Sequence, residues 1–138
     1  MDSTEKTPAY FNQWGQTRLP ELLGVDIIEV APGRMRARLP VRPELLAPNG
    51  YLHAGTVVAF SDTCAGYGCI ASLPEGATSF TTIDLSSNFL GTARSGVILA
   101  EATLRHGGRT TQVWDVTVTH EENNKVIALF RCTQLVLR

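Results

Sequence analysis

The sequence predicts an α+β protein in which one long helix lies across a curved, mainly antiparallel sheet. Two observations lead to this prediction. The stretch between Pro48 and Pro74 is apolar at most positions and nearly all round a helix axis, which is typical of a buried helix. Six runs with strand character flank it, and tight-turn signals separate the last four. Because tight turns join antiparallel neighbours, the helix most simply covers one face of their sheet.

Length and composition indicate one globular domain. The chain has 138 residues, a net charge of −1 and 43% hydrophobic residues, enough for a core over residues 8–138 after a disordered tail at residues 1–7. The near-neutral charge argues against a nucleic-acid partner held through its phosphates. Three cysteines are too few for a zinc site and make no disulfide framework, which fits reduced thiols in the cytoplasm. The polar N-terminus lacks a signal region, and no membrane partner is expected.

The segment before the long helix reads as helical turns followed by two strands. Residues 8–23 form the helical part, which Pro20 interrupts. Five of its side chains are expected to pack inward: Phe11, Trp14, Leu19, Leu22 and Leu23. The first strand covers residues 25–30, and Pro32-Gly33 turns the chain into a second at residues 34–39. That second strand alternates arginine with apolar residues, which predicts one solvated face and one buried face.

Four further strands are expected after the long helix. They cover residues 78–90, 97–106, 110–120 and 126–137. Gly107-Gly108 is a hairpin signal between the second and third of these, and Asn123-Asn124 turns the chain between the third and fourth. On the first of them, alternation places Thr82 and Asp84 on one face.

Asp62 contradicts the apolar setting of the long helix. A carboxylate on a buried helix costs free energy unless it is paired, hydrogen-bonded or shifted in pKa. The helix also contains Gly55, Gly66 and Gly68, although glycine is unfavourable in helices by about 1 kcal/mol relative to alanine. Small residues here indicate that a sheet, a second chain or a ligand approaches the helix closely.

These features resemble a known enzyme family. The order of elements is similar to the hotdog fold, in which a sheet wraps a central helix, over roughly residues 20–137. His53-Ala54-Gly55 followed by Asp62-Thr63 resembles the signature of the phenylacetate-degradation (PaaI-type) acyl-CoA thioesterases, which carry His-Gly-Gly and then an acid at this same offset. The resemblance implies hydrolysis of an acyl-CoA, with aryl or arylacetyl groups favoured, by a homodimer or a dimer of dimers.

The residues fit such chemistry. A helix N-terminus supplies free N–H groups for a developing oxyanion, here those of Ala54 and Gly55. Asp62 lies roughly 13 Å from His53 by helix rise, too far to act on the same carbonyl within one helix. The resemblance implies a site between subunits, with Asp62 as general base or as nucleophile. It also gives Thr82 a role in positioning the attacking water, on a different chain from Asp62. We expect His53 to fix the entry loop, with a catalytic base as the alternative.

The resemblance implies that coenzyme A is part of the substrate, and it implies no other cofactor or metal. Arg109 and Thr110, after the glycine turn, are the best candidates for its phosphates, because arginine binds phosphate with a bidentate fork. Arg94 is a further candidate. Asn49 and Gly50 shape the turn into the helix.

Two other functions remain open from the sequence. A hydratase or dehydratase of the same fold would need His53 and Asp62 to act together on the reacting carbons. A non-catalytic acyl-CoA sensor would need no acid, so the presence of Asp62 speaks against it.

Overall fold

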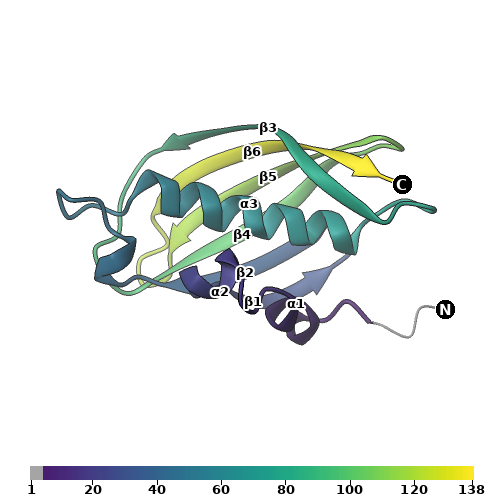
Figure 1. Ribbon diagram of the computed structural model, residues 1–138. Helices are drawn as coiled ribbons and strands as arrows, with labels where there is room; N and C mark the ends of the chain where they lie inside the picture. Colours follow the sequence, from purple (N-terminus) through teal and green to yellow (C-terminus); the bar gives the residue numbers. More distant parts are fainter. Residues whose placement is uncertain (1–4) are drawn as a thin grey trace.

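Six antiparallel strands form one curved sheet that wraps a central helix, α3 (Figure 1). The computed structural model describes residues 5–138. The strands follow the order β1-β2-β4-β5-β6-β3. Their bounds are β1 (Asp26–Ala31), β2 (Arg34–Pro40), β3 (Ser79–Phe89), β4 (Val97–Gly107), β5 (Thr111–His120) and β6 (Val126–Leu137). This is the predicted architecture, and the sequence placed each strand within a few residues of its observed ends.

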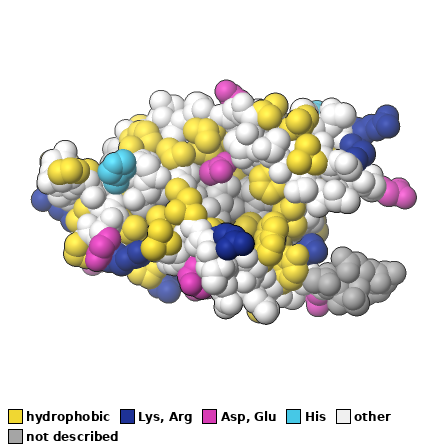
Figure 2. Space-filling view, in the orientation of Figure 1, with side chains coloured by type: hydrophobic (Ala, Val, Ile, Leu, Met, Phe, Trp, Pro, Cys, Tyr) yellow, Lys and Arg dark blue, Asp and Glu magenta, His cyan; other side chains and the backbone are white. Residues whose placement is uncertain are grey.

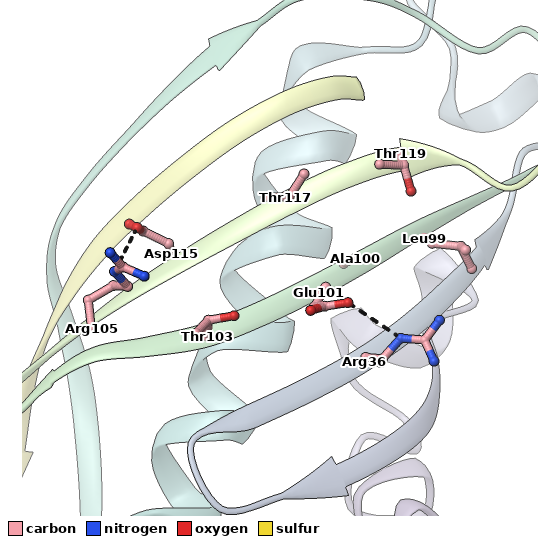
Figure 3. Close-up of a pocket in the computed structure, with 9 residues that line it drawn as sticks. All are labelled: Arg36, Leu99, Ala100, Glu101, Thr103, Arg105, Asp115, Thr117 and Thr119. Carbon is pink, nitrogen blue, oxygen red and sulfur yellow. Dashed lines mark ion pairs between the residues drawn. The ribbon is translucent and has the colours of Figure 1, made fainter. Parts of the chain in front are cut away.

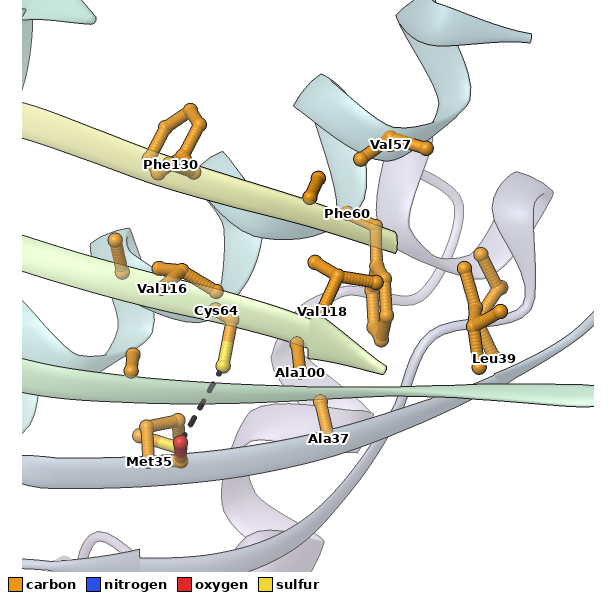
Figure 4. Close-up of a cluster of buried hydrophobic side chains, with 14 of the residues drawn as sticks. Met35, Ala37, Leu39, Val57, Phe60, Cys64, Ala100, Val116, Val118 and Phe130 are labelled. Atoms are coloured by element: carbon orange, nitrogen blue, oxygen red, sulfur yellow. Dashed lines mark hydrogen bonds between the residues drawn. The ribbon is translucent and has the colours of Figure 1, made fainter. Parts of the chain in front are cut away.

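α3 (Ala54–Ala71) is the predicted long helix. It begins at His53, whose ring Nδ1 accepts the Gly55 N–H at 2.7 Å, and it ends at Ser72, just before Pro74. One face of the helix packs on the sheet through fully buried side chains, among them Phe60 and Cys64 (Figure 4). The sheet meets them with alternate residues of its strands: Met35, Ala37, Leu39, Ala100, Val116, Val118 and Phe130.

Two of the helix glycines confirm the close approach that the sequence predicted. A Cβ at Gly68 would lie 2.8 Å from the ring of Trp114 on β5, and a Cβ at Gly66 would lie 2.6 Å from the ring of Phe80 on β3. Both distances are shorter than real Cβ contacts. The sheet therefore reaches the helix backbone at these points, and glycine leaves the rings the room they occupy.

Two short helices, α1 (Pro8–Trp14) and α2 (Leu19–Leu23), lie beside α3, and a 3₁₀ turn, η1 (Pro43–Leu45), precedes it. Asn12 ties α1 to β1, because its side-chain oxygen accepts the Ile27 N–H at 2.8 Å. The predicted tail overlaps residues 1–4, which lie outside the described residues, and at its end the Thr7 side chain caps α1.

The inward packing expected of the N-terminal segment is correct for two side chains only. Phe11 and Leu23 are buried, but the exposed fractions of Trp14, Leu19 and Leu22 are 50%, 53% and 70%. The physical reason is length: helices of seven and five residues turn only one narrow face to the core. These three side chains therefore remain on the surface, and Figure 2 shows hydrophobic side chains on the face of the molecule that carries α1, α2 and α3.

The outer face of the sheet, which points away from α3, is polar. Arg34 and Arg36 of β2 both pair with Glu29 of β1, at 3.1 and 3.2 Å, and both also approach Glu101 of β4. A shallow hollow of about 410 Å³ lies on this face, lined by arginine, acidic and threonine side chains (Figure 3). Such exposed pairs stabilise a fold little. In residues 5–138, no helix combines the length and the hydropathy that crossing a membrane requires.

Candidate active site

Asp62 lies on the face of α3 that points away from β2 and β4 and towards β3, the last strand of the curved sheet. Phe60 and Cys64 are both buried against the sheet, and at about 100° of turn per residue the position midway between them faces the opposite way. The Asp62 carboxylate is only partly covered. It accepts a hydrogen bond from the hydroxyl of Thr82 on β3, with 3.0 Å between the oxygens.

Burial raises the pKa of Asp62 above the ordinary range, and the hydrogen bond from Thr82 partly opposes this rise. The carboxyl has no ion-pair partner among the described residues. Its setting therefore holds the proton to a higher pH than water would, as in carboxyls that act as acids or bases in enzymes.

Thr82 and Asp62 meet within one chain, so the prediction that they belong to different chains of one site is wrong. β3 curls over α3 at this level, because Phe80 covers Gly66, one turn beyond Asp62. A β-bulge at Ile83 then changes the register: Thr82 pairs with Gln134, whereas Asp84 pairs with Thr133. The bulge places Thr82 and Asp84 on opposite faces of the strand, so the shared face expected from simple alternation is also wrong.

The N-terminus of α3 supplies hydrogen-bond donors, but not the pair that was expected. The Gly55 N–H is already bonded to the ring of His53, whereas the Ala54 N–H has no acceptor within bonding distance in the described part of the chain. Since Nδ1 of His53 accepts a hydrogen bond, the neutral ring carries its hydrogen on Nε2, which is then a donor. The free donors at this end are therefore the Ala54 N–H and His53 Nε2–H. His53 also caps the helix, as expected of a residue that fixes the entry loop.

An apolar hollow of about 480 Å³ borders this end of α3. Its lining residues come from α2, from η1 and the residue before it, and from the start of α3 and its cap: Leu19, Leu22, Leu23, Arg42, Glu44, Leu45, His53, Gly55, Thr56 and Ala59. The Arg42 guanidinium is engaged in holding α2, since it donates to the Leu23 carbonyl at 2.7 Å. The exposed leucines noted above therefore face a cavity next to the helix N-terminus.

Three of the residues predicted to bind coenzyme A gather at the same end. The guanidinium of Arg94 lies 4.6 Å from the ring centre of Tyr51. Asn49 accepts the Tyr51 N–H at 3.2 Å, and Gly50 between them has a φ of +88°, which only glycine adopts without strain. Asn49 and Gly50 thus shape the turn, as predicted, and present Tyr51 to Arg94.

Arg109 and Thr110 lie elsewhere in the chain. They form the β4–β5 turn, which sits near the C-terminal end of α3 (Figure 1). Gln112, just after the turn, donates to the Ser72 carbonyl at 2.9 Å. α3 has 18 residues, and each residue adds about 1.5 Å. Arg94 at one end of the helix and Arg109 at the other are therefore separated by roughly the length of the helix, about 27 Å. One chain alone does not bring them to one ligand.

Sequence reasoning missed Gln134 and Cys132 of β6, which lie behind Thr82. Gln134 is fully buried, and its side-chain oxygen lies 2.8 Å from the Thr82 hydroxyl. A polar residue at an inward position of a strand was the signal that could have identified it. As for metals, no three His, Cys, Asp or Glu side chains within residues 5–138 gather closely enough to hold an ion.

Comparisons with known proteins bear on the family and the fold. Residues 49–127 match the family model described as the thioesterase superfamily. The 1,4-dihydroxy-2-naphthoyl-CoA hydrolase of Listeria monocytogenes is 31% identical, over 83% of this chain and 92% of that protein. The acyl-coenzyme A thioesterase PaaI of Escherichia coli is 31% identical, over 79% and 75%. The crystal structure of a Haemophilus influenzae thioesterase superimposes with a TM-score of 0.90 at 30% identity, covering 98% of this chain and 93% of that one.

Proposed function

This chain belongs to the thioesterase superfamily and hydrolyses acyl-CoA thioesters, and from that premise we propose that Asp62 is the general base of a site shared between two copies of the chain. The observation that carries the proposal is the setting of Asp62: an unpaired carboxyl on the open face of α3, with its pKa raised by burial and Thr82 as donor. A base whose pKa lies closer to neutral pH takes up a proton more effectively at that pH.

In the proposed reaction, Asp62 takes a proton from water while the water oxygen bonds to the thioester carbon. The carbonyl oxygen becomes an oxyanion, which the Ala54 N–H and His53 Nε2–H stabilise at the positive end of α3. When the intermediate collapses, the C–S bond breaks and the proton passes to the sulfur. The products are a carboxylic acid and free coenzyme A. The reaction uses only side-chain and backbone groups of the protein and one water molecule.

Two copies are needed because of distance. Ala54 and Asp62 are eight residues apart on one straight helix, which corresponds to roughly 12 Å. A two-fold axis that sets two α3 helices antiparallel would bring each acid opposite the other helix N-terminus. β3 offers the surface for such a dimer: it is the last strand of the sheet and exposes Ile83, Leu85 and Phe89. A dimer of dimers would add a further interface.

We assign the acyl group to the apolar hollow at the start of α3. Its volume of about 480 Å³ is sufficient for a ring-sized group, and its leucines suit an aryl or arylacetyl chain. The related hydrolase from Listeria monocytogenes is named for an aromatic acyl group, which supports this choice. Replacing Leu22 by Trp should lower kcat/KM for arylacetyl-CoA more than for acetyl-CoA. An equal loss for both would remove this assignment.

The coenzyme is assigned to Arg94 with Tyr51 at the same end, and to Arg109 with Thr110. Because Arg109 lies at the other end of α3, it reaches the same nucleotide only if two antiparallel copies form the site. Both arginines are exposed and able to bind phosphate.

Asp62→Asn tests the base directly. We expect turnover, followed as release of the free thiol from a panel of acyl-CoAs, to fall by about 10²- to 10⁴-fold. Asp84→Asn is the matched control, since that carboxyl lies on the other face of β3 and should leave turnover unchanged. Near-normal turnover in folded Asp62→Asn would refute the proposal. Single turnover in ¹⁸O-water adds a check: label found in the Asp62 carboxylate would identify a nucleophile that forms an anhydride, not a base.

Ala54→Pro tests the oxyanion donor and the shared site together. Proline removes the N–H but is favourable at the first position of a helix, and His53 already has the extended backbone that proline requires before it. Ala54→Ser keeps the N–H and serves as control. When Ala54→Pro and Asp62→Asn proteins are unfolded and refolded together, half the dimers are mixed and hold one intact site. About a quarter of wild-type activity should return, by counting alone. No recovery, with mixed dimers confirmed by mass, would refute a site shared in this way.

A further inference from the structure

A hydrogen-bond chain runs from Asp62 into the buried side of the sheet. Thr82 Oγ1 lies 3.0 Å from Asp62 Oδ1 and 2.8 Å from the side-chain oxygen of Gln134. The Gln134 side-chain nitrogen in turn lies 3.3 Å from Cys132 Sγ. Gln134 and Cys132 are fully buried on β6, the strand that pairs with β3. This series of hydrogen bonds therefore joins α3, β3 and β6 through side chains alone.

The hydrogen bonds of this series can run in either of two donor-to-acceptor directions, because Thr82 has only one hydroxyl hydrogen to donate. The Thr82 hydroxyl has one hydrogen, so it cannot donate to Asp62 and to the Gln134 oxygen at once. When Asp62 is protonated, the carboxyl donates to Thr82, Thr82 donates to the Gln134 oxygen, and the Gln134 NH₂ faces the Cys132 sulfur. When Asp62 is ionised, Thr82 donates to it instead. Thr82 then needs a donor on its other side, and a half-turn of the Gln134 amide supplies its NH₂.

We propose that Gln134 is a positioning residue for Asp62, whose side-chain amide turns over as that carboxyl gains or loses its proton. In each state every polar group of the chain keeps a partner, so neither state leaves a buried group unsatisfied. The inference rests on the proposed function only in giving the proton transfer at Asp62 a role in the reaction. The NH₂ of Gln134 polarises the Thr82 hydroxyl, which strengthens its bond to the carboxylate.

The other titratable groups beside this hydrogen-bond network do not share the titration of Asp62, whose pKa burial raises above the ordinary range of a carboxyl. Burial raises the pKa of the Cys132 thiol to about 12, and the charge of Asp62 adds to this rise. Cys69 of α3, which lies near Cys132, also has a pKa of about 12 through burial. Both thiols stay protonated, so Cys132 can donate to the Gln134 oxygen or accept from its nitrogen. Asp84, the nearest further carboxyl on β3, lies on the opposite face of that strand.

The test is the ionisation of Asp62 in Gln134→Met and Gln134→Glu, measured in two ways. Carboxyl-carbon NMR of aspartate-labelled protein gives the pKa of Asp62 without reference to activity, and the acid limb of the kcat/KM profile gives its effect on turnover. Gln134→Met removes the donor behind Thr82, so both readouts should move to higher pH by about half a unit. Gln134→Glu keeps the size of the side chain and adds a second carboxyl, which should move them further in the same direction.

Two controls separate this role from simple packing. Gln112→Met removes the other fully buried glutamine, which pairs with Gln134 in register but bonds to Trp114 and Ser72, and it should leave the Asp62 titration unchanged. In a Thr82→Val background, Gln134→Met should cause no further shift, because the link is already broken. An unmoved Asp62 titration in both Gln134 variants, or an equal shift in Gln112→Met, would overturn the proposal. If the NMR titration moves while the acid limb does not, Gln134 retains its role and Asp62 loses its place as the base.

Discussion

Gly68→Ala should destabilise the protein although alanine is the better helix former. The new Cβ would lie 2.8 Å from two ring carbons of Trp114, whereas ordinary contact begins at 3.4 Å, so the ring or the helix must move by about 3.4 − 2.8 = 0.6 Å. Trp114 has no room to yield, because it is fully buried and its Nε1–H donates to Gln112 at 2.8 Å. Overpacking costs about 1–3 kcal/mol, and the gain in helix propensity is about 1 kcal/mol, so we expect a net loss of about 1 kcal/mol.

Urea unfolding at one fixed protein concentration measures this loss, with tryptophan fluorescence and circular dichroism as probes. The matched control is Gly66→Ala on the same helix. Its Cβ meets the tip of the Phe80 ring, which is only partly buried on the last strand of the sheet and can move aside. Gly66→Ala should therefore be the milder change. The reasoning about Trp114 is refuted if Gly68→Ala matches or exceeds wild type in its urea midpoint with an unchanged slope.

Three further predictions concern the site. Because burial raises the pKa of Asp62 in the folded protein, ionising it there costs stability as pH rises through the window above the unfolded pKa. Asp62→Asn should thus gain stability relative to wild type across that window, whereas a constant difference from pH 3 to 8 would contradict this. His53→Asn should keep the helix cap and lower kcat. His53→Ala should lower kcat and also reduce the free energy of unfolding by about 1 kcal/mol, because the cap is lost. An unchanged kcat in His53→Asn would show that His53 does not bind the oxyanion. Arg109→Ala should raise KM for acyl-CoA but not for a thioester that lacks the nucleotide, and equal effects on both would place Arg109 elsewhere.

Hydrophobic periodicity located β2, β4, β5 and β6, because alternate residues of these strands are buried, and it located α3, because most of its residues are buried. β3 has no fully buried residue and was located by its β-favouring composition between turn signals. Asp62 was recognisable for the opposite reason, as a charge where the pattern required an apolar residue. The N-terminal segment shows where such reasoning fails: Trp14, Leu19 and Leu22 look like core residues in composition, but their helices are too short to bury more than one face.

Contacts between segments were beyond the sequence. The bulge at Ile83 adds one residue to β3, and nothing in the local pattern of residues 78–90 marks that position. With strict alternation Thr82 and Asp84 share a face, so the pairing of Thr82 with Asp62 in the same chain was not expected. Gln134 was overlooked for a related reason, because its partner is set by the register between β3 and β6. The commitment of the Gly55 N–H to His53 likewise depends on a side-chain torsion that sequence does not specify.

The exposed edge of β3 has a consequence for how the protein is made in the cell. An eleven-residue strand with one unpaired side and several apolar side chains is a template for any extended segment it meets. If the dimer proposed above forms along this strand, a newly folded chain faces a kinetic competition between association with a second folded copy and misassembly with unfolded chains. The rate of association depends on the square of the concentration of folded protein. Slow synthesis and a high concentration of unfolded chains therefore both favour misassembly. Expression yield should then respond to changes on this strand, such as Ile83→Lys, that leave the free energy of the isolated fold nearly unchanged.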